Sequence, residues 1–249
     1  RKPLAKNAFS FIATYLSVFL EIRKLFSAKY TAKMLGLDAT SFSLRSQEGR
    51  CATCMGRGEV VVTMKFLDDS FIVCHDCQGK RFKPQILEVY HEGFNIADVL
   101  ELTIDQAYKL FSKYSKIIKP LSLAREIGLG YLRLGQSLYS LSGGESQRIK
   151  LVSILNSVKK EREQIIIFDE PTRGLHELDV TKLMKVIKKL SNSGNTVLVI
   201  EHHLKFLSLC DWVVDMGPGA AIEGGNVVYA GIPHGLKKIA ISETAKYVY

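Results

Sequence analysis

The chain has 249 residues, of which 47% are hydrophobic. That length allows one large domain or two smaller ones with a substantial core, and the composition excludes a disordered or membrane-embedded chain. The net charge is +9, which permits an anionic partner such as nucleic acid without requiring one. The basic excess lies in residues 1–50 and 101–150, whereas residues 51–100 carry five basic and seven acidic side chains.

The first predicted element is an apolar stretch from Phe9 to Leu20 that continues in helical register through residues 21–26. Basic residues precede it, as in a signal peptide. However, this 12-residue stretch is too short to cross a bilayer, which needs about 20 residues. We therefore expect one buried amphipathic helix and no membrane segment, followed by an irregular stretch rich in Ser and Thr.

Two Cys-x-x-Cys pairs enclose two β-like runs, residues 59–66 and 70–73, joined by a turn-like tip at residues 67–69. The spacing is typical of a four-thiolate zinc site, because the hairpin returns the second pair to the first. A closed site of this kind has no position for a substrate water, so we predict a structural Zn²⁺. Its ligands are Cys51, Cys54, Cys74 and Cys77.

Several residues near the cysteines have two readings. Gly56, Gly58 and Gly79 relieve the turns that follow the pairs. A disulfide framework is the alternative to zinc, and it leaves a fifth cysteine, Cys210, which we expect in the core. We expect His75 at the surface or beside the site. The zinc module either contacts DNA or acts as a brace; its basic residues are Arg57, Lys65, Lys80, Arg81 and Lys83.

From Thr103 the pattern is helical. Thr103 and Gln106 form a predicted capping box. One apolar face runs from Ile104 to Ile118, and a further helix over residues 121–127 ends at Gly128.

After Gly144 the predicted elements alternate between helix and strand. A helix to about residue 158 precedes a strand at 165–168, a helix at 177–191, a strand at 196–200, a short helix at 203–209 and a strand at 212–216. The strands are continuously apolar, which favours parallel strands covered on both faces. The second half is therefore α/β, and the first half is helical with a zinc insertion.

Three groups of residues in this half suggest phosphate chemistry. Ser142-Gly143-Gly144 lies at a helix start, where backbone N–H groups and the helix dipole attract an anion. Asp169 and Glu170 end a strand and are suited to hold Mg²⁺ through water and to orient an attacking water. His202 follows the next strand, where it can reach a terminal phosphate. Each alone is common, but all three in this order and spacing are hard to explain by chance.

Leu141–Gln147 resembles the signature motif of ABC-type ATPases, Ile165–Glu170 their Walker B strand and His202 their switch histidine. More narrowly, the runs SLSGGESQRIKL, FDEPTRGLH, GNTVLVIEHH and DWVVDMGP resemble the C-terminal half of the UvrA family, the damage-sensing subunit of bacterial nucleotide excision repair. The zinc hairpin extends this resemblance through nearly the whole chain.

The resemblance implies an ABC-type P-loop ATPase lobe, with a mostly parallel sheet and flanking helices, joined to a helical signature region with a zinc-ribbon-like hairpin. It implies ATP with Mg²⁺ as cofactor. Ser142, Gly143, Gly144 and Gln147 would face the γ-phosphate of a nucleotide bound on a partner module. Asp169 would serve the metal, Glu170 the water and His202 the γ-phosphate of the module's own nucleotide, and residues 174–176 would couple the two sites.

The family's partners are a second copy of itself, damaged double-stranded DNA and a UvrB-like helicase subunit, which binds the half of the protein that precedes this segment. A cytoplasmic location is implied with them. The expected divisions are a helical segment at 1–50, the zinc module at 51–90, a second helical segment at 91–140 and the ATPase core at 141–249.

Three departures from the family pattern stand out. No G-x-x-x-x-G-K-[ST] run occurs in the sequence, so the main phosphate cradle is absent and we expect this chain alone to be inactive. Arg173 stands where the family usually has Thr, and Leu16-Ser17 replaces a Thr-Gly pair.

Two alternatives remain. The nucleotide-binding subunit of an ABC transporter shares the ATPase motifs but predicts no zinc insertion. A zinc-dependent DNA- or protein-binding module without ATPase activity would fit the cysteines, which resemble DnaJ-type zinc knuckles. That reading leaves Asp169, Glu170 and the signature run without a purpose.

Overall fold

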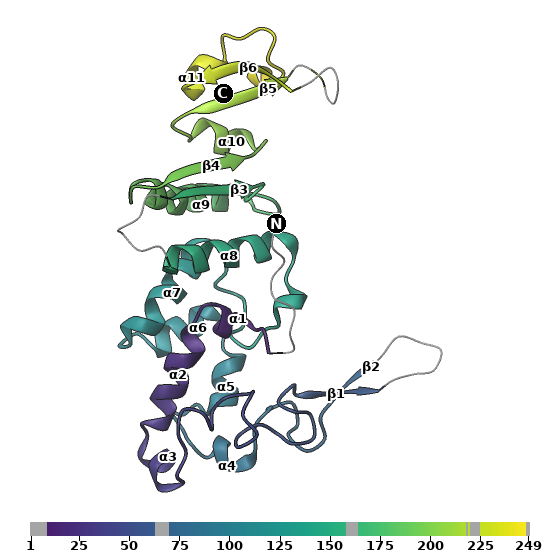
Figure 1. Cartoon of the computed structure of the whole chain (residues 1–249), viewed down its shortest axis with the longest axis vertical. Coiled ribbons are helices and arrows are strands. Elements are labelled where there is room, and N and C mark those ends of the chain that lie inside the picture. Colours follow the sequence, from purple (N-terminus) through teal and green to yellow (C-terminus); the bar gives the residue numbers. More distant parts are fainter. Residues whose placement is uncertain (1–8, 63–69, 158–163, 218, 220–224, 248–249) are drawn as a thin grey trace. The chain divides into compact units, whose positions relative to one another are not determined.

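The computed structural model describes residues 9–62, 70–157, 164–217, 219 and 225–247. The chain divides into two compact units, Arg1–Ser157 and Val158–Tyr249 (Figure 1). None of the helices within the described ranges combines the length and apolar character that crossing a bilayer requires.

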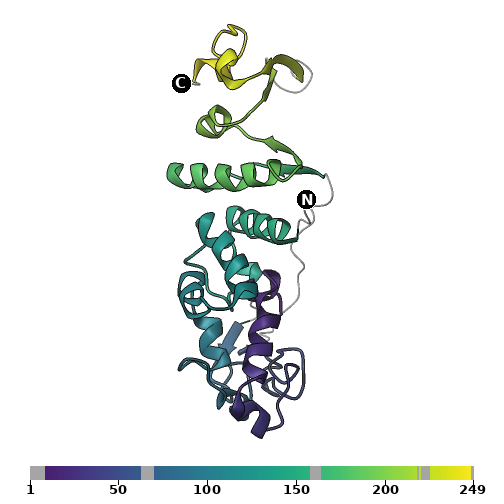
Figure 2. The ribbon, with the colours of Figure 1, turned by 90° about the vertical axis from the view of Figure 1, so that its left-hand side faces the viewer.

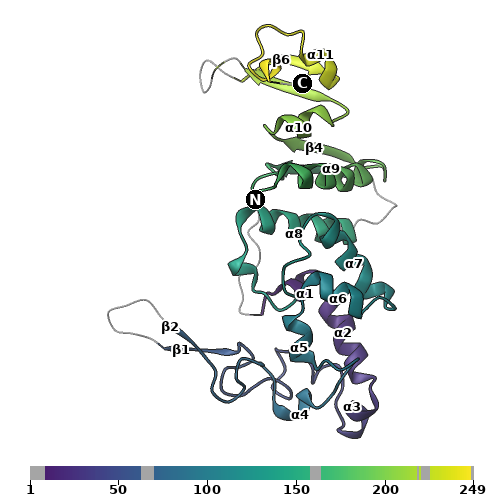
Figure 3. The same ribbon diagram turned by 180° about the vertical axis from the view of Figure 1, so that it is seen from behind.

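Unit 1 is a helical body from which a two-stranded hairpin projects, as the opposite views of Figure 1 and Figure 3 show. Its elements are α1 (Ile12–Tyr15), α2 (Val18–Ser27), α3 (Tyr30–Met34), β1 (Glu59–Val62), β2 (Ser70–Val73), α4 (Pro84–Leu87), α5 (Ile96–Glu101), α6 (Ile104–Leu110), α7 (Ser115–Glu126), a 3-10 turn (Leu138–Ser140) and α8 (Gly143–Ser157).

The predicted first helix is two helices. α1 ends at Tyr15 and α2 begins at Val18, because Ser17 has a left-handed backbone with φ of 61° that no α-helix can contain. The apolar pattern nevertheless identified the buried side chains, since Ile12, Phe19, Ile22 and Phe26 are all in the core.

The helix boundaries between Thr103 and Gly128 also differ from the prediction. The capping box of Thr103 and Gln106 is confirmed, with both reciprocal hydrogen bonds present. α6 then ends at Leu110, and α7 runs from Ser115 to Glu126 as one helix. The break falls at residues 111–114, where Tyr114 is extended, so the apolar face predicted for one helix is shared by two.

Aromatic rings form part of the core of unit 1. The ring of His91 stacks on Phe111 with 5.7 Å between centroids and meets Phe26 and Tyr114 edge-on. His91 is 2% exposed, and of the groups that the structure describes, none forms a hydrogen bond with either ring nitrogen.

The predicted hairpin is confirmed as an antiparallel pair, in register from Glu59↔Val73 to Val62↔Ser70. Its predicted tip at residues 67–69 lies outside the described residues. Three successive apolar residues of β2, Phe71, Ile72 and Val73, are exposed.

Unit 2 contains β3 (Ile165–Asp169), α9 (Glu177–Ser191), β4 (Thr196–Ile200), α10 (Leu204–Ser208), β5 (Val213–Gly217), β6 (Asn226–Gly231), α11 (Pro233–Leu236) and a 3-10 turn (Thr244–Lys246). β3 and β4 are parallel, as predicted, in register from Ile165↔Thr196 to Asp169↔Ile200. α9 packs against β4, and Figure 2 shows this helix from the side. The unit is thus mixed α/β with small sheets.

Within the described residues, two features of these strands differ from the expectation. The β3–β4 pair is covered on one face only, and on the other face Ile165, Ile167, Leu198 and Ile200 are exposed. β5 is not parallel to a neighbour in the described residues. It pairs antiparallel with β6, which the sequence analysis did not predict. A groove of about 910 Å³ runs between β4 and β5 and is lined by successive residues of both, 197–202 and 212–216.

Candidate zinc centre and nucleotide-site residues

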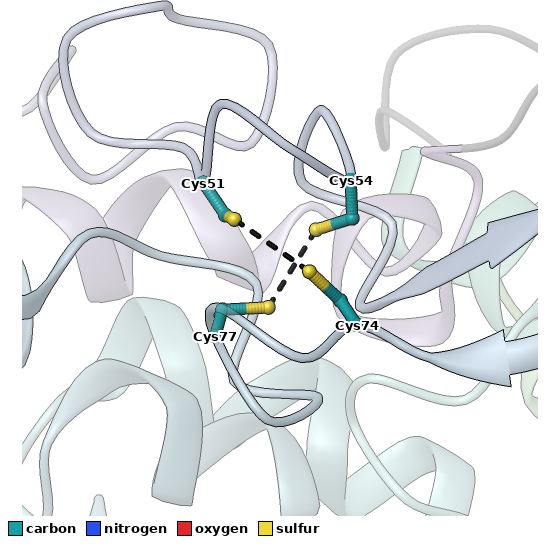
Figure 4. Close-up of side chains that lie close together, drawn as sticks. All are labelled: Cys51, Cys54, Cys74 and Cys77. Carbon is teal, nitrogen blue, oxygen red and sulfur yellow. Dashed lines mark hydrogen bonds between the residues drawn. The ribbon is translucent and has the colours of Figure 1, made fainter.

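The four predicted zinc ligands meet at one point of unit 1. The Sγ atoms lie 3.9 Å apart for Cys51 and Cys74 and 3.6 Å apart for Cys54 and Cys77 (Figure 4). All four sulfur atoms lie within 4.8 Å of one another. A tetrahedral ion with Zn–S bonds of about 2.3 Å requires S–S separations of about 3.8 Å, so the cluster has the dimensions of a Zn²⁺ site. These separations are too long for disulfides, and all five cysteines are free.

The two halves of this cluster repeat the same backbone turn. After Cys54, Met55 and Gly56 have φ of 53° and 81°, and after Cys77, Gln78 and Gly79 have φ of 47° and 81°. Two left-handed residues in succession turn the chain tightly enough for a Cys-x-x-Cys pair to direct both sulfurs inward. The predicted role of the glycines is confirmed at Gly56 and Gly79, and Gly58, with φ of 84°, shares it.

The thiols differ in acidity although they share one pocket. Burial raises the pKa of Cys77 to about 12, whereas backbone N–H groups, chiefly that of Cys77, lower the pKa of Cys74 to about 7. Burial also raises the pKa of Cys54. Thiolates this close repel one another, and a bound Zn²⁺ supplies the positive charge that ionises all four.

The basic residues around the cluster have separate roles. Arg81 donates from Nη1 to the carbonyl of Gly135 at 3.3 Å, which ties the zinc module to the helical body. Lys65 lies outside the described residues. His75 is at the surface, where its Nε2 lies 3.1 Å from a carboxylate oxygen of Asp76. Cys210, in unit 2, is partly buried rather than fully in the core, and burial raises its pKa to about 11.

The predicted phosphate-binding helix start is present as the first turn of α8. Gly143 is exposed and a Cβ built there would meet nothing within 4 Å. The Ser142 N–H, however, is already used: it donates to Glu145 Oε2 at 2.7 Å, and the Glu145 N–H donates to Ser142 Oγ at 3.3 Å. This reciprocal pair is a capping box, and the Ser-x-x-Glu spacing that signals it was overlooked in the sequence analysis.

Glu145 also accepts a hydrogen bond from the hydroxyl of Tyr131. Its burial acts to raise its pKa, but the hydrogen bonds from Tyr131 and Ser142 and the charge of Arg148 outweigh burial, and the pKa is lowered. An ionised carboxylate therefore occupies the positive end of α8. Gln147, on the next turn, is partly buried.

The remaining site residues lie at one edge of unit 2. Asp169 and Ile200 are the last residues of β3 and β4 and are paired in register. Glu170 therefore follows β3, and His202 follows β4, at the same end of the strand pair. The Glu170 N–H donates to the Ile200 carbonyl at 2.9 Å, which holds the two strand ends together. The His202 side chain is exposed. Carboxyl ends of parallel strands are where α/β sheets place their ligands.

Glu170 has a strained backbone. Its φ is 48°, a left-handed value that is uncommon for a residue other than Gly and recurs at functional sites. A turn closes after it, with the Arg173 N–H donating to the Glu170 carbonyl at 3.2 Å. The Arg173 guanidinium also lies 3.7 Å from a Glu170 carboxylate oxygen, so the residue that departs from the family pattern contacts the predicted water-orienting group.

A further acidic residue, Glu201, directly follows the end of β4 and was missed. Its carboxylate accepts hydrogen bonds from Thr172 and from the backbone of His202 and His203. Its position directly before His202 at a strand end was the signal that could have found it.

A comparison with family models found no match. Over 248 residues, the chain is 42% identical to UvrABC system protein A of Aquifex aeolicus (strain VF5), a match that covers 100% of this chain and 27% of the relative. It is 40% identical to the protein of the same name in Staphylococcus aureus (strain COL), covering 26% of that relative. The chain thus spans about a quarter of the length of the curated relatives it matches.

Among solved structures, the fold matches the crystal structure of UvrA2 from Deinococcus radiodurans with a TM-score of 0.89 and 43% identity. That match covers 99% of this chain and 30% of UvrA2. Sequence and fold therefore agree that this chain is similar, along its whole length, to one segment of UvrA-type proteins.

Proposed function

We propose that this chain is part of a DNA-damage-recognition ATPase of nucleotide excision repair, in which ATP binding and hydrolysis modulate the grip on damaged duplex DNA. The observation that carries the proposal is a match over the whole of this chain, at 40–43% identity, to a segment of UvrABC system protein A. The four-cysteine cluster supports it against the transporter alternative, which predicts no zinc insertion. Asp169, Glu170 and His202 at one sheet edge support it against a zinc module without ATPase activity.

In this proposal the chain supplies parts of composite ATP sites in a homodimer. Asp169 serves Mg²⁺ and Glu170 orients the attacking water, while His202 binds the γ-phosphate. Ser142, Gly143, Gly144 and Gln147 face the γ-phosphate of a nucleotide held by a partner module. In this proposal the ATPase core is residues 141–249, and residues 174–176 couple the sites.

The phosphate cradle must come from elsewhere in the protein, because the sequence has no G-x-x-x-x-G-K-[ST] run. The groove between β4 and β5 supports this, since it lies between two strands that each have one partner among the described strands. We infer that a further strand, followed by the phosphate-binding loop, fills it in the complete protein.

From the similarity to UvrA proteins we also propose duplex DNA and a UvrB-like subunit as partners, and a cytoplasmic location. Zn²⁺ at the four cysteines has a structural role. DNA contact by the zinc module remains part of the proposal for Arg57, Lys80 and Lys83, and not for Arg81, whose side chain is committed to Gly135.

The test uses a UvrA-length protein that contains this chain. Its equilibrium binding to a duplex with and without one bulky lesion is measured across a salt series, with and without ATP. We expect a lesion preference that depends on nucleotide, and the salt slope counts phosphate contacts. Absence of DNA binding at every salt concentration would contradict the repair function and leave an ATPase with another partner.

The 249-residue chain alone provides a second test. Without the phosphate cradle, it should bind ATP poorly and hydrolyse it negligibly. Isothermal titration with ATP and Mg²⁺ measures this, and tight binding would show that the cradle is not required.

A further inference from the structure

Glu201 is the first residue after β4, beside the end of β3, at the candidate nucleotide site. Asp169 and Ile200 are the last paired residues of β3 and β4, so Glu170 and Glu201 are the first residues beyond the pair. The chain after Glu170 leads to Thr172, and the chain after Glu201 leads to His202. Glu170 is the proposed water-orienting residue, and His202 is the proposed phosphate-binding residue. A side chain that bonds both Thr172 and His202 therefore connects the segments that carry these two residues.

The Glu201 carboxylate makes this junction with both oxygens. Oε1 accepts from the Thr172 N–H at 2.8 Å and from the Thr172 hydroxyl at 2.5 Å. Oε2 accepts from the N–H groups of His202 at 2.9 Å and His203 at 3.1 Å. Each oxygen thus serves one of the two segments.

The surroundings favour an ionised carboxylate held by neutral donors. Burial acts to raise the pKa of Glu201, but the hydrogen bonds from Thr172, His203 and His202 outweigh it and the pKa is lowered. Within the described residues, the ion pairs found in unit 2 do not include Glu201. Hydrogen bonds to a charged acceptor are about twice as strong as neutral ones, so the junction is firm without a cation.

The segment after β3 needs such an anchor. Glu170 holds its left-handed backbone at a cost that the surrounding structure must offset. Thr172, two residues later, is 6% exposed, and the Glu201 carboxylate bonds both its N–H and its hydroxyl.

We propose that Glu201 is a positioning residue that braces the Glu170 segment against the His202 segment, so that the water-orienting carboxylate and the phosphate-binding imidazole keep a fixed separation during ATP hydrolysis. This inference rests on the proposed ATPase function. Glu201 itself does not touch nucleotide. Its effect is on the hydrolytic step, where misplacement of catalytic groups is costly, and not on nucleotide binding.

The main test is Glu201→Gln in a UvrA-length protein that contains this chain, assayed for ATP hydrolysis. The amide has the shape of the carboxylate but only one acceptor oxygen. Whichever way it turns, its NH₂ group faces either the Thr172 donors or the two histidine N–H groups. We expect kcat to fall by about tenfold or more, as for the loss of hydrogen bonds to a charged group, with KM for ATP changed by less than about threefold.

Thr172 supplies a matched pair of variants. Thr172→Ser keeps the hydroxyl donor and should retain nearly all of kcat. Thr172→Val keeps the shape and loses the donor, so it should lower kcat with little change in KM. Glu177→Gln is the control, because Glu177 is exposed and forms only a 3.7 Å surface ion pair with Lys205. It should leave both constants unchanged.

A readout without hydrolysis uses the 249-residue chain. In ¹⁵N NMR spectra recorded over a pH series, the amides of Thr172, His202 and His203 should titrate together with one pKa, below that of an ordinary Glu. Glu201→Gln should remove this common titration.

The outcomes separate the two hypotheses. Wild-type hydrolysis with an unchanged kcat in Glu201→Gln overturns the brace alone. Equal loss in Thr172→Ser and Thr172→Val, together with a lower melting temperature, also overturns it, because a general loss of stability would then explain the result. Absence of hydrolysis in the wild-type protein overturns the proposed ATPase function and, with it, the catalytic role of the brace.

Discussion

Replacement of His91 by Phe should stabilise unit 1. His91 is almost fully buried among Phe26, Phe111 and Tyr114, and none of the described groups bonds its ring nitrogens. A buried polar group without a partner costs about 1–3 kcal/mol. Phe preserves the aromatic packing without this cost, although its larger ring strains the pocket by about 1 kcal/mol. We expect the free energy of unfolding to rise by about 1 kcal/mol near neutral pH.

The difference between His91→Phe and wild type should grow at lower pH. Burial lowers the pKa of His91 in the folded chain; the charge of Lys29 lowers it further and that of Glu92 opposes both. In the unfolded chain the His91 imidazole takes up a proton with a pKa of about 6.5. In the folded chain His91 is still neutral at that pH. Wild-type stability therefore falls as pH decreases below about 6.5, by at most about 1.4 kcal/mol per pH unit, until the lowered folded pKa is reached.

Urea unfolding at about pH 7.5 and about pH 5.5 measures both effects, and hydrogen exchange in α6 and α7 assigns them to unit 1. His234→Gln is the control, since His234 is exposed and lies in unit 2. The reasoning would be refuted if His91→Phe were less stable than wild type at both pH values, or if the two proteins had the same pH dependence.

Three further predictions concern other parts of the chain. Ser17→Gly should raise the free energy of unfolding by about 0.5–1 kcal/mol, because Gly adopts the φ of 61° without strain; a lower urea midpoint would contradict this. Removal of Zn²⁺ by a chelator should increase hydrogen exchange in residues 51–62 and 70–82 and leave the α/β unit intact, and a uniform loss of helical circular dichroism would argue against a local zinc brace. Glu145→Gln in a UvrA-length protein should lower KM for ATP, because it removes a negative charge from the start of α8 where we propose that phosphate binds. An unchanged or higher KM would show that the carboxylate does not compete with phosphate.

Local patterns in the sequence predicted most helices and the zinc cluster. The capping box at Thr103, helix α9, the parallel strands and the four cysteines each depend on residues whose chemistry acts over short spacing. The roles predicted for Ser142, Gly143, Gly144, Gln147, Asp169, Glu170 and His202 remain predictions. The structure adds that Asp169 ends β3, that Glu170 follows it, and that His202 follows the neighbouring strand β4.

Other features depended on contacts that no local pattern contains. Ser17 has nothing in its own chemistry to indicate a left-handed residue, so a continuous apolar pattern was read as one helix although it is two. β6 was overlooked because its pairing with β5 decides that it is a strand. The sequence left Arg81 as either a DNA contact or part of a brace, and its bond to the Gly135 carbonyl, 54 residues away in sequence, is a contact that no local pattern contains.

The sequence by itself determined the chemistry of this protein: four thiolates spaced for Zn²⁺, a glycine-rich helix start, and acidic and histidine residues after apolar strands. Spacing and side-chain type suffice for these because each is a property of a few neighbouring residues. Only the tertiary structure decided which hydrogen-bonding groups already have a partner within the chain, and which distant segments are connected by hydrogen bonds. Glu145 fills the helix start that appeared open, and Glu201 links two segments 29 residues apart, because such bonds depend on where the fold brings distant residues together.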